Sequence, residues 1–432
     1  MIVIYMIELE SDNNDLSREK TMPNVSRRNV LAVIGAGAFA ASSWRAFGQQ
    51  SDVIKIGLLT DMNGPLSQAV GPGAVISAKM AIDEFAKAHP EIKVELEVAD
   101  MQNKTDLVVS IAREWMDSKG FDVITEVPNS AGVLALTPLL SERDRVGLFT
   151  SSQSTKVTGA GCGTNTTQWM GDAWANSKSV VEAQLKLGGK KWFFITADTA
   201  FGIDLQDTAG KFVVKGGGTV VGSVKHPFPG NTEFSSYLLQ AQASGADVIG
   251  VANSGPDAIN CIKQAAEFGI IKKGQKIAGL SLDVLAVRSI GLDIAQGVIV
   301  ADSFYWDFND QTRAFSKAFK ALHGEIPTGQ QACQYSALHN YLNAVAIVGV
   351  AEAKKSGRAV LKQMRSAPME DPLFGPIVLR EDGRTVRRML VLQAKSPEQS
   401  KSKDDILAVI SEIPGDEAFR PLSEGGCPLI KS

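Results

Sequence analysis

The chain has 432 residues, of which 44% are hydrophobic and 21% charged, and its formal net charge is −3 at pH 7. This composition is typical of a globular protein, and the small net charge gives no electrostatic reason to bind nucleic acid or anionic lipid. About 380 residues follow the leader described next, which exceeds one ordinary hydrophobic core and predicts two lobes.

Residues 1–48 are predicted to form a leader that contains a secretory signal peptide. Arg27-Arg28 precede an apolar run at 30–41, and Ala46-Phe47-Gly48 offers a cleavage site. The paired arginines favour the twin-arginine route. The apolar run is shorter than the roughly 20 residues of a membrane span, and a buried core helix is the alternative. We expect an exported protein, with Met22 rather than the first residue as its start.

Strand-like and helix-like segments alternate along the rest of the chain. The first series runs strand 53–60, helix 74–88, strand 92–99, helix 107–118, strand 121–127, helix 131–140 and strand 146–150. The pattern restarts near 170–177 with helix 178–187, strand 192–197, helix 205–215, strand 219–224, helix 234–244, strand 247–252, helix 257–268 and strands 276–280 and 297–302. Buried strands separated by helices predict an α/β fold of two doubly wound parallel-sheet lobes.

Two further helices, at 311–323 and 330–355, belong to neither series of strands. Asp382-Gly383 then separates the apolar runs 376–379 and 389–393. An Asp-Gly pair between two such runs predicts a turn or hairpin.

The chain contains four cysteines, and they form no Cys-x-x-Cys pair, so neither a redox motif nor a structural zinc site is expected. Cys261 lies in a helical pattern and is predicted to be a buried small hydrophobe. Export to an oxidising compartment permits disulfides. Cys162, in a glycine-rich loop, and Cys427, near the end, are the predicted pair.

Enzyme signatures are missing from the sequence. It has no Walker A pattern, no His-Glu-x-x-His and no Gly-x-Ser-x-Gly. Gly71-Pro-Gly73 is a poor dinucleotide loop because Pro72 lacks the N–H that such a turn needs. The four histidines show no metal-ligand spacing. We expect no enzyme activity, no cofactor, no metal and no nucleic-acid partner.

Four segments occur in the order of a known family. They are Ile54–Pro65, with a Gly-Pro turn after the first strand; Phe121–Ser130 followed by Val146–Ser154; Ala197–Gly202, with an aromatic residue before glycine; and Leu373–Pro376 leading to Glu381–Gly383. Residues 53–394 therefore resemble the periplasmic solute-binding proteins of the leucine/isoleucine/valine type, which are receptors of ABC importers with a type I periplasmic binding fold.

The resemblance implies two lobes joined by three crossing segments, with a small organic ligand in the cleft between them. Lobe one would comprise 52–173 and 303–379, and lobe two 174–302 and 380–432. We expect a monomeric periplasmic receptor that delivers its ligand to an ABC permease. The alternatives are a ligand-sensing component of a periplasmic signalling system and an exported α/β enzyme.

Polar residues follow strands of both series at the expected cleft. Ser130, Ser152 and Ser154 come just after two strands of the first series, and Asn253 and Ser254 follow a strand of the second. Serine hydroxyls beside helix N-termini suit a carboxylate or amide oxygen. The alternative for such a serine is to cap its own helix.

Aromatic and acidic residues complete the predicted site. Phe201 stands where the family places an aromatic residue against the ligand, and Trp169 and Trp306 fall at predicted lobe crossings, where rings can stack on a flat ligand. Packing is the alternative for all three. Asp283 is offset from the family position that secures an ammonium group. Together these residues favour an aryl carboxylate or another partly apolar organic acid, with branched-chain amino acids as the alternative.

Overall fold

Two parallel sheets carry the alternating strands and helices in the computed structural model, which describes residues 53–430. The predicted leader and its paired arginines lie outside the described residues. The predicted fold class, α/β with two parallel-sheet lobes, is confirmed. Within residues 53–430, no helix combines the length and the apolar character that a membrane crossing requires.

The first sheet has the order β2-β1-β3-β4-β5, and its neighbouring strands are all parallel. The strands are β1 (Val53–Thr60), β2 (Lys93–Asp100), β3 (Val123–Glu126), β4 (Val146–Phe149) and β5 (Thr166–Gln168). β3 and β4 are buried along their whole length, as expected for a parallel sheet covered on both faces.

Helices of the first lobe cover both faces of this sheet. They are α1 (Gly71–Ala88), α2 (Thr105–Ser118), α3 (Ser130–Arg143), η1 (Thr155–Thr158), α10 (Asp310–His323), α11 (Gly329–Val348), α12 (Val350–Lys355) and α13 (Gly357–Arg365). One core packs α1 and α10–α13 on the sheet, and a second core packs α2 and α3 on the other face. The two helices that belonged to neither predicted series thus complete the first lobe.

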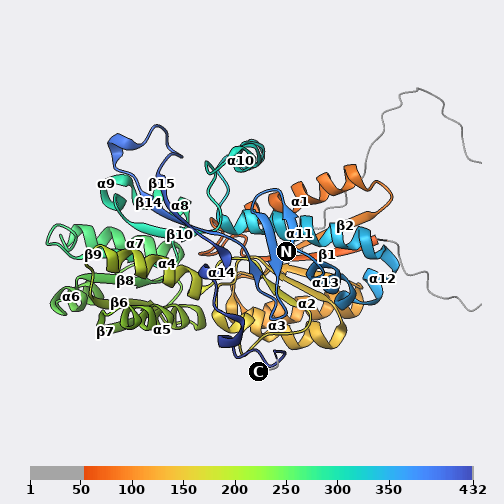
Figure 1. Cartoon of the computed structure of the whole chain (residues 1–432), viewed down its shortest axis with the longest axis horizontal. Coiled ribbons are helices and arrows are strands. Elements are labelled where there is room, and N and C mark those ends of the chain that lie inside the picture. The colour runs from red at the N-terminus through yellow and green to blue at the C-terminus, as the bar shows by residue number, and fades with distance from the viewer. Residues whose placement is uncertain (1–52, 431–432) are drawn as a thin grey trace, which may run out of the picture. The chain divides into compact units, whose positions relative to one another are not determined.

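The second sheet has the order β7-β6-β8-β9 and is also parallel. Its strands are β6 (Lys191–Ala197), β7 (Thr219–His226), β8 (Val248–Ala252) and β9 (Lys276–Gly279). Its helices are α4 (Ala173–Lys186), α5 (Ala200–Lys215), α6 (Ser235–Ala243), α7 (Gly255–Glu267), α8 (Val284–Ile290) and α9 (Leu292–Ala295). One core contains α6–α9 and another contains α4 and α5, so both faces of this sheet are covered (Figure 1).

A three-stranded sheet corrects one prediction. The last strand of the second series, β10 (Ile299–Asp302), does not extend the parallel sheet but pairs antiparallel with β14 (Met389–Ala394), which pairs with β15 (Leu407–Ile413). A buried apolar run indicates burial on both faces and not the direction of its partner strand, so the sequence pattern could not distinguish these arrangements.

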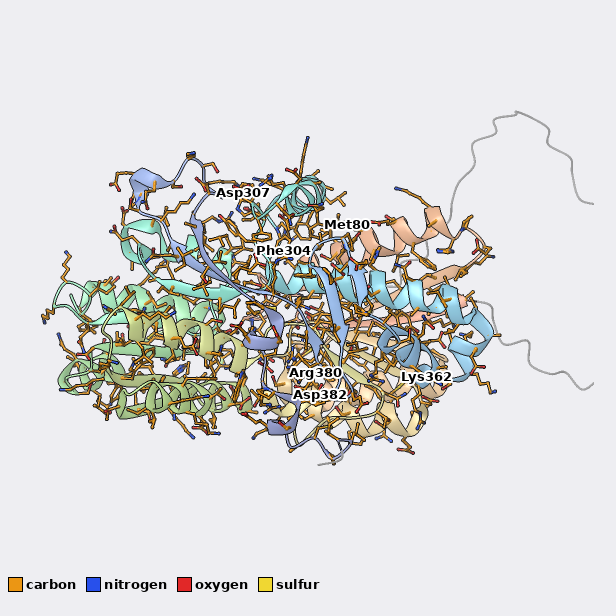
Figure 2. The ribbon with its side chains drawn as sticks, in the orientation of Figure 1. Met80, Phe304, Asp307, Lys362, Arg380 and Asp382 are labelled. Atoms are coloured by element: carbon orange, nitrogen blue, oxygen red, sulfur yellow. A yellow bond between two sulfur atoms is a disulfide. The ribbon has the colours of Figure 1, made fainter. Side chains whose placement is uncertain are left out.

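The Asp-Gly turn occurs where predicted, but its second strand is different. β12 (Gly375–Leu379) pairs with the short β13 (Thr385–Val386) and with β11 (Met369–Asp371), rather than with the run at 389–393. Arg380 Nε donates to Asp382 Oδ1 at 3.1 Å across this turn (Figure 2). The remaining short helices are η2 (Pro397–Gln399), α14 (Gly415–Ala418) and η3 (Leu422–Glu424).

Buried Arg384 ties two lobe-crossing segments together. Its Nη1 donates to Met170 O at 2.6 Å and its Nη2 to Asp172 Oδ2 at 3.0 Å, in the segment between β5 and α4. Arg384 itself lies in the turn between β12 and β13, in the segment that leads on to β14. An arginine with a paired carboxylate and carbonyl acceptors satisfies its charge and its donors in a buried position.

Cys162 and Cys427 form a disulfide, with their Cα atoms 5.6 Å apart. The bond fastens the end of the chain to the loop after η1 in the first lobe. Arg420 adds a second attachment there, because its Nη2 donates to Thr155 O at 3.0 Å. Cys261 is buried, as its helical pattern predicted.

Candidate ligand-binding site

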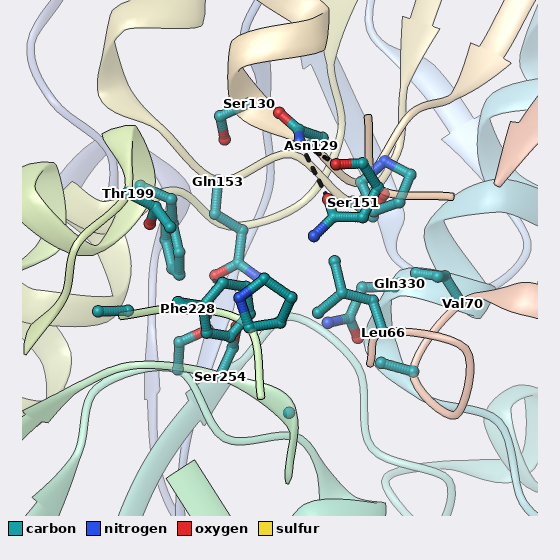
Figure 3. Close-up of a pocket in the computed structure, with 18 of the residues that line it drawn as sticks. Leu66, Val70, Asn129, Ser130, Ser151, Gln153, Thr199, Phe228, Ser254 and Gln330 are labelled. Atoms are coloured by element: carbon teal, nitrogen blue, oxygen red, sulfur yellow. Dashed lines mark hydrogen bonds between the residues drawn. The ribbon is translucent and has the colours of Figure 1, made fainter. Parts of the chain in front are cut away.

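A cavity of about 320 Å³ lies at the carboxyl ends of the strands of both sheets (Figure 3). The first lobe contributes the loops after β1, β2, β3 and β4 and the start of α11, and the second contributes the loops after β6, β7, β8 and β9. Open α/β sheets bind ligands at this edge, and the volume is in the range of small-molecule sites. The lining residues are Leu66, Ala69, Val70, Asn103, Pro128, Asn129, Ser130, Ala131, Ser151, Gln153, Ala197, Thr199, Ala200, Phe201, Phe228, Pro229, Ser254, Gly255, Ser281, Asp283 and Gln330.

Polar groups at the start of α3 line the first-lobe side of the cavity. Asn129 caps this helix, because its side-chain oxygen accepts a hydrogen bond from Gly132 N at 3.0 Å. Ser130 follows, and its hydroxyl lies 3.0 Å from that of Ser152. Since Asn129 performs the capping, the hydroxyl of Ser130 is not needed for it.

Gln153 joins the two lobes at the wall of the cavity. Its Oε1 accepts hydrogen bonds from Asn176 Nδ2 on α4, at 2.9 Å, and from Ser281 Oγ after β9, at 3.1 Å. Both acceptor positions of the amide are therefore used within the protein. The amide nitrogen, a donor, is the part of Gln153 that remains for a ligand.

Two phenylalanine rings line the second-lobe side. Phe201 lies in the first turn of α5 and Phe228 follows β7. Thr199 caps α5 by accepting from Gly202 N at 3.0 Å. Ser254 precedes α7 and, within the described chain, its side chain makes no capping hydrogen bond, which leaves its hydroxyl to the cavity (Figure 3).

Asp283 is the one charged side chain among the lining residues that the structure describes. Its Oδ1 accepts from Ala286 N at 2.8 Å and so caps α8. Desolvation raises the pKa of this carboxyl, and hydrogen bonds from the helix backbone and the charge of Arg288 oppose the rise. Between residues 53 and 430, no group of three or more His, Cys, Asp or Glu side chains is placed to hold a metal ion.

The cavity brings together four of the nine predicted ligand-binding residues, namely Ser130, Phe201, Ser254 and Asp283. They come from α3, α5 and the loops after β8 and β9, so both lobes contribute. Their contact with a ligand stays a prediction.

Three further predicted polar residues lie outside the lining. Ser152 is buried behind Ser130. Ser154 donates through its hydroxyl to Asp204 of the second lobe at 2.9 Å. Asn253 is buried, with its Nδ2 3.0 Å from His226 Nε2. These three side chains therefore support the walls of the cavity.

Both predicted tryptophans also lie outside the lining. Trp169 is fully buried in the core of the first lobe, where its Nε1 donates to Thr167 Oγ1 at 2.9 Å. Trp306 donates to Asp404 O at 2.9 Å and borders a different cavity of only about 10 Å³. Their positions favour the packing alternative and remove two of the three rings that favoured an aryl ligand.

The sequence reasoning missed Ser151, Gln153 and Phe228. Ser151 and Gln153 alternate with the predicted serines in the same strand-end loop, and the sequence does not show which of the alternate side chains face a cavity. Phe228 follows a strand of the second series, as Phe201 does. Phe201 was selected from the family resemblance, whereas the signal that could have found Phe228 was its position after a strand.

Two parallel-sheet lobes with a cavity at their strand ends define a two-lobed receptor for a small ligand. A family model described as periplasmic binding protein matches residues 53–403. The chain belongs to the periplasmic binding protein family.

Relatives of this chain agree with that assignment. A periplasmic binding protein from Burkholderia mallei is 36% identical, with a TM-score of 0.83 over 88% of this chain and 100% of that one. A branched chain amino acid ABC transporter periplasmic ligand-binding protein from Burkholderia xenovorans LB400 is 38% identical, with a TM-score of 0.77 over 87% and 99%. Leu/Ile/Val-binding protein homolog 4 of Brucella melitensis biotype 1 is 21% identical over 411 residues, or 91% of this chain and 97% of the relative. The predicted resemblance to solute-binding receptors of ABC importers is confirmed.

Proposed function

We propose that this receptor captures a small, partly apolar carboxylate between its lobes and delivers it unchanged to an ABC permease. The observation that supports this is the two-sided lining of the cavity. Phe201 and Phe228 offer apolar rings on one side, and hydroxyl and amide groups lie on the other. The rings would bury the apolar body of the ligand. The Ser130 hydroxyl and backbone N–H groups at the start of α3 would donate to its carboxylate.

Asp283 favours an α-amino acid with an apolar side chain over an aryl carboxylate. The cavity lining of the described chain contains this carboxylate and no cationic side chain. An ammonium group would pair with Asp283, whereas a ligand with only a negative charge would be repelled by it. The two phenylalanine rings are the observation that keeps the aryl carboxylate as second candidate.

A thermal-shift screen of the purified mature protein tests this proposal. The compounds are aliphatic amino acids, aryl carboxylates, short-chain acids, amides and urea. A ligand at about 100 times its Kd stabilises the folded protein by roughly 2.7 kcal/mol. We expect a rise in Tm with a carboxylate that has an apolar part. No shift with any carboxylate, in a sample shown to be folded, would contradict the proposal.

The variant Asp283→Asn separates the two ligand classes. The amide keeps an oxygen to cap α8 but removes the charge. We expect the affinity for L-leucine, measured by calorimetry, to fall at least about 100-fold, since leaving one partner of a desolvated ion pair unpaired costs about 3–5 kcal/mol. Binding of 4-hydroxybenzoate would be unchanged or tighter. Asp293→Asn, at an exposed position on α9, is the matched control, and an unchanged leucine affinity in Asp283→Asn would refute the role of Asp283.

We further propose that the chain reaches the periplasm by the twin-arginine route. The support is the pair Arg27-Arg28 before an apolar run, together with membership of a periplasmic binding family. Replacing both residues (Arg27→Lys, Arg28→Lys) should reduce the periplasmic fraction strongly, as measured by immunoblot after fractionation. Full export of the double variant would argue for another route.

A further inference from the structure

Glu126, the last residue of β3, is a fully buried acid two residues before Pro128, which lines the cavity. Its exposed fraction is 0%, and none of the described residues donates a hydrogen bond to either Oε1 or Oε2. A buried carboxyl without partners is costly in a folded protein. Such a group therefore calls for an explanation.

The backbone at this position is strained as well. Glu126 has φ +79° and Val127 has φ +55°, in the left-handed region that L-residues rarely adopt and that is especially unfavourable for a β-branched valine. The cavity-lining residues Pro128, Asn129 and Ser130 follow immediately. Strain of this kind persists where the surrounding structure holds it in place, most often at functional sites.

Ser151 adjoins Glu126 and also lines the cavity. It follows β4, whose Phe149 is paired with Glu126 in the parallel register. Its hydroxyl, like the carboxyl of Glu126, has no hydrogen-bond partner in the described chain. The charged group that faces Glu126 comes from the end of β1: Asp61, which is held by Gly64 N and Leu66 N at 2.9 Å each.

These surroundings keep the acid protonated at neutral pH. Burial raises the pKa of Glu126 to about 8, the Ser151 hydroxyl opposes the rise, and the negative charge of Asp61 adds to it. A neutral carboxyl has one O–H to donate, whereas a carboxylate can only accept.

We propose that Glu126 is a positioning residue of the ligand site: when a ligand binds, these two unpartnered groups pair, so that the neutral acid donates to Ser151 and leaves the Ser151 hydroxyl to donate to the ligand carboxylate. Once Glu126 loses its proton, Ser151 must donate to Glu126 instead, and a buried negative charge lies behind it. Binding of an anionic group would then weaken, because Ser151 no longer donates to it and because the buried negative charge repels it. This inference rests on the proposed function, because it assigns a role toward a ligand carboxylate.

A first experiment needs no ligand. A group whose folded-state pKa is raised contributes stability that is full below its ordinary pKa, near 4.5, and is lost as the pH rises to about 8. We expect the Tm of the wild type to fall more steeply between pH 5 and 8 than that of Glu126→Gln. Because burial also raises the pKa of Asp302 to about 7, the infrared absorption of protonated carboxyls at pH 7 should be weaker in the variant than in the wild type rather than absent. Identical Tm profiles and spectra would overturn the protonated state.

A second experiment measures binding between pH 6 and 9 by calorimetry, with L-leucine and 4-hydroxybenzoate as probes. We expect the wild-type Kd to rise up to about tenfold per pH unit once Glu126 titrates, and the profile of Glu126→Gln to be nearly flat. Comparison with the variant removes the titration of the probe itself. Glu267→Gln, an exposed glutamate of α7, is the matched control and should keep the wild-type profile.

Ser151→Ala provides an independent variant, because it keeps Glu126 but removes the hydroxyl that reaches the ligand. We expect weaker binding and a much smaller pH dependence. A wild-type pH profile in either Glu126→Gln or Ser151→Ala would overturn the proposal, even if one of the two does not fold. Failure of every carboxylate in the screen to bind would reject the carboxylate ligand and with it this role, while the first experiment would still report the protonation of Glu126 separately.

Discussion

Replacing Lys354 with methionine is expected to lower the free energy of unfolding by about 3–5 kcal/mol. Lys354 lies on α12, and its Nζ donates to Asp122 Oδ2 at 2.9 Å and to Val53 O at 2.8 Å. The two charged side chains are only 7% and 2% exposed. Methionine preserves the length of the side chain but leaves the carboxylate of Asp122 buried without its cation, and that uncompensated charge causes the loss.

Urea denaturation of Lys354→Met provides the measurement, and Lys355→Met is the matched control. Lys355 is the next residue of the same helix, but its side chain is 77% exposed and its ion pair with Glu352 is at the surface. We expect this control to lie within about 0.5 kcal/mol of the wild type. Equal losses of unfolding free energy in the two variants would mean that the buried pair of Lys354 and Asp122 stabilises the protein no more than the exposed ion pair of Lys355.

Replacing Asp204 with alanine is expected to weaken ligand binding about 10- to 100-fold without any direct contact with the ligand. Asp204 lies on α5 of the second lobe, outside the cavity lining. Its carboxylate accepts from Ser154 Oγ at 2.9 Å, Thr155 N at 2.6 Å and Thr155 Oγ1 at 2.8 Å, all in the first lobe. Opening the cleft here would break these bonds. A hydrogen bond to a charged group contributes about 1.5–3 kcal/mol, and 1.4 kcal/mol corresponds to a tenfold change.

Calorimetry with each ligand found in the screen tests this prediction, and the ratio of affinities is the informative quantity. Because Asp204 would act on the closed arrangement of the lobes, every ligand should lose affinity by a similar factor. Asp207→Ala, at an exposed position one turn along the same helix, should leave affinity unchanged. A loss confined to one ligand class would indicate a direct contact instead.

The pattern of apolar residues predicted the strands well because it depends only on residues that are neighbours in the sequence. The strand expected at 53–60 is β1 with the same bounds, and the run at 192–197 corresponds closely to β6. The pairing of Cys162 with Cys427, suggested by an oxidising compartment and by loop positions, is present in the structure. The pairing of strands that are distant in the chain was harder to predict. β10 is the example, because its apolar run fits a parallel and an antiparallel neighbour equally well.

The aromatic residues predicted for the site show the same limit of sequence-based prediction. Trp169, Phe201 and Trp306 all lie near a strand end or a crossing, and only Phe201 lines the cavity. A large ring is buried in either case, since burial of its apolar surface is favourable in a core as well as against a ligand. The sequence could not distinguish the two environments.

By itself, the sequence determined the alternation of strands and helices, the two lobes and the edge at which the site lies, because periodicity and strand-end position are properties of neighbouring residues. Only the tertiary structure decided which side chains at that edge face the cavity. It turned Gln153 rather than Ser152 toward the lining, set Ser154 against Asp204, and buried Glu126 next to Ser151. These outcomes depend on register and packing between segments far apart in the chain, which no local pattern of residues encodes.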